Sequence, residues 1–181
     1  MESLMKRKIM RVAAVASTVA VLSLMLAAPA QAYAKNGCSW GSPNVNWFYS
    51  GQDYGDFKAS ADEAANNWNV THVKMTHLDT GPFKAYIQDD GNSGYSGWTE
   101  WECSSTQQTT KAESHLNTHD TVGVEYGEKV AIWAHEFGHG LGLNHSTPGN
   151  IMFSCAGCTY QDFGKRNKPQ EDDRNGINSL Y

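Results

Sequence analysis

A histidine-rich stretch, HEFGHGLGLNH at positions 135–145, constrains the fold of this chain more than any other segment. On an α-helix each residue turns by about 100°, so His135 and His139 lie one turn apart on the same side. At that spacing both imidazoles reach one zinc ion at about 2.0–2.1 Å. Gly142 suits the left-handed conformation that ends a helix, and a sharp turn would then present His145 as a third ligand. The stretch therefore predicts a helix, a glycine turn and a shared zinc site.

Glu136 directly follows the first histidine and lies on the edge of the same helix face. This position allows it to take a proton from a metal-activated water without being a ligand. Three protein ligands leave the fourth position open for water, which distinguishes a catalytic zinc site from a closed structural one. The bare motif HExxH is a frequent chance match, but here a glycine and a third histidine follow at useful offsets.

Two later segments extend the pattern. Asn150–Phe153, with the sequence NIMF, follows at the distance of a Met-turn, and the run from Asp172 to Tyr181 is similar to a C-terminal helix. Together with these segments, HEFGHGLGLNH resembles the zinc signature HExxHxxGxxH of the metzincins. Its form is similar to that of the matrixins, the matrix-metalloprotease-like branch. Weaker similarity, in the order strand, helix, strands, extends over most of the remaining chain.

The resemblance implies an α+β fold: a twisted mixed sheet, three helices, and an active-site cleft between a larger upper and a smaller lower subdomain. The sheet would be mostly parallel with one antiparallel edge strand. The resemblance also implies individual roles. Zinc would be bound by His135, His139 and His145, Glu136 would be the general base, Met152 would underlie the metal, Asp173 would tie the last helix to the Met-turn, and Asp172 would pair with the mature N-terminal ammonium.

Residues 1–32 have the pattern of a secretory signal peptide. Four basic residues against one acidic residue lie in 1–11, an apolar run covers 12–26, and Ala30-Gln31-Ala32 forms an Ala-x-Ala site. A membrane-spanning helix needs about 20 apolar residues, so we favour cleavage over an uncleaved membrane anchor. We expect the cut after Ala32, with a cut after Ala34 as the alternative. The mature protein would be secreted.

Removing 32 of the 181 residues leaves 149 and takes the formal net charge from −5 to −8. That length fits one domain, the catalytic domain at residues 33–181. An acidic chain without a basic stripe argues against nucleic acid or an anionic membrane as a partner. We expect a monomer that acts on protein or peptide substrates, with no nucleic-acid partner and no membrane partner after signal cleavage.

All four cysteines lie in the part of the chain expected to be exported. An even number in an oxidising compartment predicts two disulfides, and four cysteines allow three connectivities. We favour Cys38–Cys103 together with a small loop closed by Cys155–Cys158. A redox-active Cys-x-x-Cys is the alternative for the second pair, but no strand-then-helix pattern surrounds it.

Hydrophobic periodicity predicts the elements around the histidine stretch. A first helix is predicted from apolar residues at helical spacing, with Asp56 as its N-cap; these residues are Phe57, Ala61, Ala64, Ala65 and Trp68. A second helix is predicted from Glu128 to Leu141, and a third from Pro169 to Tyr181 with the proline at its first position. Strands are predicted over 44–50, 70–78, 84–88, 97–102 and 112–117.

Two other groups of polar residues offer weaker sites. His115 and His119 are four residues apart and could bind a second metal, but their segment has no helical pattern, so we favour a surface or cleft-rim position. The run 89–92, with the sequence DDGN, has oxygen ligands suited to calcium. It lacks the full calcium-loop pattern, so a plain turn is favoured and Ca²⁺ is only a secondary candidate beside Zn²⁺.

These features predict a secreted zinc-dependent endopeptidase that hydrolyses peptide bonds in proteins, with a zinc-bound water activated by Glu136. The alternative is a non-catalytic secreted zinc-containing binding protein on the same fold. Glu136 discriminates between the two, because a protein that only binds has no need of a base beside the zinc ligands.

Overall fold

Five strands build a mixed sheet in a computed structural model that describes residues 32–181. The strand order is β3-β2-β4-β6-β5. Three strand pairs are parallel, and only β5 runs antiparallel, along β6, at the edge of the sheet. This pairing agrees with the sheet that the matrixin resemblance implies. The strands are β2 (Asn44–Ser50), β3 (Lys74–His77), β4 (Phe83–Gln88), β5 (Gly97–Cys103) and β6 (Thr109–Asn117).

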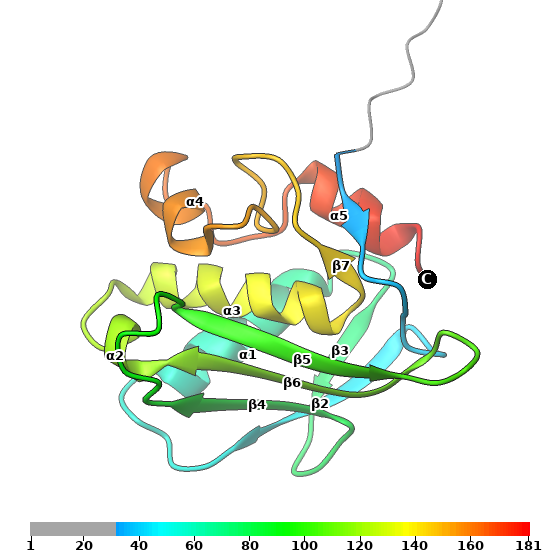
Figure 1. The fold of residues 1–181 in the computed structure, drawn as a ribbon, viewed down its shortest axis with the longest axis horizontal. Coiled ribbons are helices and arrows are strands. Elements are labelled where there is room, and N and C mark those ends of the chain that lie inside the picture. Colours follow the sequence, from blue (N-terminus) through cyan, green and yellow to red (C-terminus); the bar gives the residue numbers. More distant parts are fainter. Residues whose placement is uncertain (1–31) are drawn as a thin grey trace, which may run out of the picture. The chain divides into compact units, whose positions relative to one another are not determined.

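Two long helices, α1 (Phe57–Trp68) and α3 (Tyr126–Gly140), lie side by side over one face of this sheet (Figure 1). The five apolar residues that predict α1 are all buried. Most of α3 is buried as well, and Phe137 packs its ring against Trp47 of β2 and Phe83 of β4. The main core therefore lies between the sheet and these two helices.

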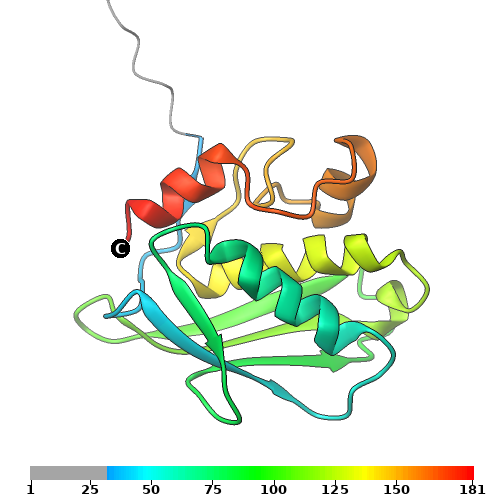
Figure 2. The same ribbon diagram turned by 180° about the vertical axis from the view of Figure 1, so that it is seen from behind.

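Elements β1 (Ala34–Lys35), β7 (Leu143–Asn144), α4 (Ala156–Asp162) and α5 (Glu171–Asn178) form a second layer on the far side of α3, which Figure 2 shows from behind. A short antiparallel pair joins β1 to β7. Helix α4 packs on α3, and α5 contacts β7. One turn of helix, α2 (Thr118–Thr121), follows β6. Among residues 32–181, no helix is both long and apolar enough to cross a membrane.

Two helix starts differ from the prediction. Asp56 holds the N-cap position of α1, but its side chain makes no capping hydrogen bond and instead pairs with Lys129 of α3 at 2.6 Å. An oppositely charged, largely buried partner outcompetes the backbone N–H groups for this carboxylate. The last helix begins at Glu171 and not at Pro169, because Gln170 is extended.

The predicted strand 70–78 was too long, and only 74–77 belongs to β3. The side chain of Asn69 bonds to both the N–H and the C=O of Met75, which closes residues 70–73 into a turn. The three predicted helices are present as α1, α3 and α5, and α2 and α4 are additional short helices of the described chain.

Both predicted disulfides are confirmed, Cys38–Cys103 and Cys155–Cys158. The first joins the segment after β1 to the end of β5, and the second stands at the start of α4. The predicted signal peptide, apart from its last residue, lies outside the described residues.

Candidate metal centre

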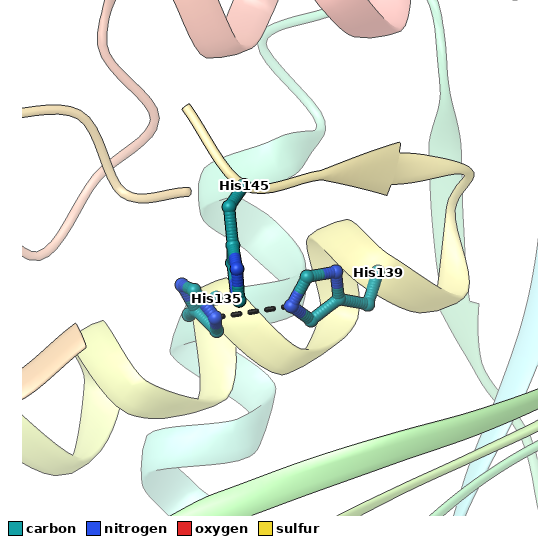
Figure 3. A group of neighbouring side chains, drawn as sticks. All are labelled: His135, His139 and His145. Atoms are coloured by element: carbon teal, nitrogen blue, oxygen red, sulfur yellow. Dashed lines mark hydrogen bonds between the residues drawn. The ribbon is translucent and has the colours of Figure 1, made fainter. Parts of the chain in front are cut away.

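Three histidines converge at the end of α3 (Figure 3). His135 and His139 stand one turn apart on α3, and His145 directly follows β7. One ring nitrogen from each lies within 4.8 Å of the others. Gly142 allows the chain to turn sharply between α3 and β7, because its φ of +113° is rarely adopted by other residues. A side chain there would also meet the carbonyl oxygen of Cys38 at 2.7 Å. The predicted helix and glycine turn are confirmed, and His145 lies beside the other two histidines, while its role as a zinc ligand stays a prediction.

The hydrogen bonds of the histidines orient their lone pairs toward one point. Nδ1 of His135 lies 2.8 Å from the carbonyl oxygen of Ile151, and Nδ1 of His139 lies 2.9 Å from that of Leu143. A carbonyl only accepts, so both Nδ1 atoms carry the proton and both Nε2 atoms carry a lone pair. These Nε2 atoms are 3.1 Å apart, close to the roughly 3.3 Å between two nitrogens of a tetrahedral zinc site. Two facing lone pairs repel unless a cation binds both, so this donor set fits zinc.

Burial shifts the pKa values of two of the histidines and of the neighbouring glutamate. It lowers the pKa of His135 to about 3, an effect to which neighbouring His139 adds, and it lowers the pKa of His139 to about 4. Both imidazoles are therefore uncharged near neutral pH, as ligation requires. Burial raises the pKa of Glu136 to about 8, against a smaller lowering by a hydrogen bond from Thr99. The raised pKa makes the Glu136 carboxylate a stronger proton acceptor than an ordinary glutamate, which suits a general base.

The segment predicted to be a Met-turn is hydrogen-bonded to His135 and to the residue after His145. Ile151 and Met152 are fully buried, and the Ile151 carbonyl is the acceptor for His135. The backbone N–H of Ser146, next to His145, donates to the Met152 carbonyl at 2.8 Å. Gly138 leaves room for Met152, since a Cβ at 138 would stand 2.2 Å from its sulfur. The turn thus fixes both the first and the third histidine.

Asp173 joins helix α5 to this turn, as the resemblance implies. Its Oδ2 accepts from the N–H groups of Ile151 and Gln170, and its Oδ1 accepts from that of Met152. Its neighbour Asp172 accepts a hydrogen bond from the backbone N–H of Ala32 at 3.1 Å. The pairing of Asp172 with a mature N-terminal ammonium stays a prediction.

Asp173→Asn is expected to lower the free energy of unfolding by about 2 kcal/mol. The amide oxygen can replace Oδ2, but the amide nitrogen would then face the N–H of Met152 and leave it without an acceptor. Urea unfolding measures the change, with Asp162→Asn on the exposed end of α4 as a control expected to change stability by less than about 0.5 kcal/mol. Equal stabilities of Asp173→Asn and the unmodified protein would show that these bonds contribute nothing.

Comparison with known proteins agrees with this geometry. Residues 55–181 match the sequence model of the Peptidase_M10 family, described as matrixin. The chain belongs to the matrixin family. A solved structure described as the "GM1 bound form of the ECX AB5 holotoxin" is also similar, with a TM-score of 0.59 and 13% sequence identity over 82% of this chain and 86% of that one. That degree of identity shows a shared fold and nothing more.

The second metal site considered from the sequence of this matrixin is not assembled. His115 is fully buried on β6, bonded to Asp90 at 2.6 Å, whereas His119 is exposed on α2. The surface or cleft-rim position predicted for the pair is therefore wrong for His115, whereas His119 does lie at the surface. A buried histidine is tolerated in this strand because Asp90 supplies an acceptor and Tyr86 and Trp98 cover the ring.

The run 89–92 lies in the loop between β4 and β5, where Asp89 Oδ1 accepts from the N–H of Gly91 and the Asp90 carboxylate is bonded to His115 and Gln88. A calcium site there has no support. Within residues 32–181, only the histidine triad brings together three or more side chains of the metal-ligating types.

The matrixin site also includes residues that sequence reasoning missed. Trp101 of β5 stacks near His139, with ring centroids 6.3 Å apart. Thr99 of the same strand bonds to Glu136. An alternating pattern would place these two residues on one face of a strand, but nothing in the sequence tells which helix that face meets.

Proposed function

We propose that this matrixin is a secreted zinc endopeptidase that hydrolyses peptide bonds in proteins. The observation that carries the proposal is the convergence of three histidine ligand atoms within 4.8 Å, with Glu136 on the same helix as two of them. Burial decreases from His135 through His139 to His145, so the ligand cluster opens to solvent on the His145 side. An open side is what a substrate needs and a purely structural zinc site lacks.

In the proposed reaction, His135, His139 and His145 hold the ion through uncharged imidazoles. When bound, zinc supplies Lewis-acid activation of a water molecule and of the scissile carbonyl. Glu136 accepts the proton of the attacking water and passes it to the leaving amine nitrogen, which completes the hydrolysis. The Ile151 and Leu143 carbonyls keep His135 and His139 in the ligating tautomer throughout.

Secretion is part of the proposal and is supported by the leader pattern in 1–32 and by two disulfides, which persist in oxidising compartments. A monomer acting without nucleic acid or membrane, and a substrate cleft between two subdomains, belong to the same proposal. The competing function is a zinc-containing binding protein, for which the carboxyl of Glu136 would have no use.

The test is mass spectrometry of an unfolded protein after incubation with the purified, zinc-loaded chain, with and without a zinc chelator. We expect internal cuts that the chelator abolishes and that added zinc restores. Cuts that persist in chelator would overturn the zinc mechanism. Intact substrate in the presence of a folded chain with one zinc bound would favour the binding protein.

A further inference from the structure

The edge strand β5 contacts the proposed base directly. Thr99 Oγ1 lies 2.8 Å from Oε2 of Glu136 and 2.9 Å from the backbone carbonyl oxygen of the same residue. Ser114, fully buried on neighbouring β6, places its Oγ 2.9 Å from Thr99 Oγ1 and 3.2 Å from the Glu136 carbonyl. Two hydroxyl groups on two strands therefore surround one glutamate.

Thr99 and Ser114 have one hydroxyl hydrogen each, so the two side chains can donate only two of these hydrogen bonds. Each hydroxyl donates only one hydrogen, and both oxygens of interest on Glu136 only accept when its side chain is ionised. A hydrogen bond to a carboxylate is roughly twice as strong as one between neutral groups. Ser114 can serve the backbone carbonyl, or donate to Thr99, so the proton of Thr99 is directed to Oε2.

Gly97 provides the space beside the same carboxylate. A Cβ at this position would stand 3.2 Å from both Cγ and Oε1 of Glu136, and 2.7 Å from the carbonyl oxygen of His115. Residues 97, 99 and 101 lie on the same face of β5. On that face Trp101 lies against His139. Strand β5 therefore packs closely against the turn of α3 that carries Glu136 and His139.

We propose that Thr99 is a positioning residue that holds the Glu136 carboxylate in one orientation for proton transfer. Its hydroxyl fixes Oε2, and Gly97 leaves room for Oε1, which is the oxygen free to exchange a proton with water. A glutamate side chain has three rotatable bonds, so fixing it before the reaction removes an orientational cost from the rate-limiting barrier. The inference rests on the proposed peptidase function.

The kinetic test compares Thr99→Val, which keeps the shape but removes the hydroxyl, with Thr99→Ser, which keeps the hydroxyl. We expect Thr99→Val to lower kcat by about 10- to 100-fold with little change in KM, and Thr99→Ser to remain within about 3-fold of the unmodified protein. Thr110→Val is the matched control, because Thr110 also bonds to β5, at the Glu102 carbonyl, but is exposed. An unchanged kcat in Thr99→Val, with Glu136→Ala inactive, would overturn the positioning role and leave the proposed function standing.

A second measurement does not depend on activity. Thr99→Val is expected to lower Tm by about 3 °C in the unmodified protein, and by less than half of that in Glu136→Ala, where the carboxylate is absent. All four proteins are compared at one zinc concentration, because bound metal raises Tm. Equal losses in both backgrounds would overturn the contact whether or not the chain cleaves peptides. An unmodified protein without turnover would overturn the proposed function, and with it the catalytic role of Thr99.

Discussion

Glu136→Gln is expected to lower kcat for peptide hydrolysis by about 10²- to 10⁴-fold, the usual contribution of a general base. Glutamine has the same shape and can still accept the hydrogen bond from Thr99, but its amide cannot take up the proton of the attacking water. Glu136 is 95% buried and lies close to Gly97. A variant of the same shape therefore keeps the packing and changes only the ability to accept a proton. Steady-state kinetics on a fluorogenic peptide measure the loss.

Zinc content decides how that loss is interpreted. Because Glu136 is not one of the three converging ligands, the variant should bind one zinc per chain with unchanged affinity. Glu128→Gln, two helix turns earlier on α3, is the matched control and should retain full activity. Full activity in Glu136→Gln would contradict the proposed mechanism, whereas loss of zinc together with activity would place the effect at the metal site.

Periodicity in the sequence was sufficient for the elements that are long and regular. The strand predicted over 44–50 has those bounds, and the second helix was placed within two residues at each end. The zinc ligands were found because their spacing is local: a helix turn and a glycine turn bring all three together within eleven residues. Such features depend on neighbours in sequence, which a single chain displays directly.

The features that the sequence did not reveal depend on contacts between distant segments. Helix α4 has no apolar period, and it is held by Tyr160 bonding to Glu125 and by Thr159 bonding to the Asn150 carbonyl. The burial of His115 depends on Asp90, 25 residues away. Thr99 meets Glu136, 37 residues away, only because β5 lies against α3, a contact that no local pattern specifies. These contacts become visible only when the sheet order is known.

Replacing both Cys38 and Cys103 by serine is expected to lower the free energy of unfolding by about 4 kcal/mol. The two cysteines are 65 residues apart, so their bond removes a large amount of conformational freedom from the unfolded chain. Cys155 and Cys158 are only three apart, and the same replacement there should cost about 2 kcal/mol. Urea unfolding of the two double variants under identical zinc and buffer conditions gives the comparison.

The Cys38–Cys103 variant should also bind zinc more weakly, and this follows from what surrounds the bond. On one side of Cys38, Asn36 donates to the carbonyl of His139 at 2.7 Å, and on the other, Trp40 donates to that of Gly140 at 2.9 Å. These bonds provide donors for two carbonyl groups in the last turn of α3, the turn that carries the proposed second zinc ligand. Freeing the segment from β5 lets that turn fray, so zinc affinity should fall together with stability. A variant that loses stability but keeps its zinc affinity would show that the segment holds the helix end without the disulfide.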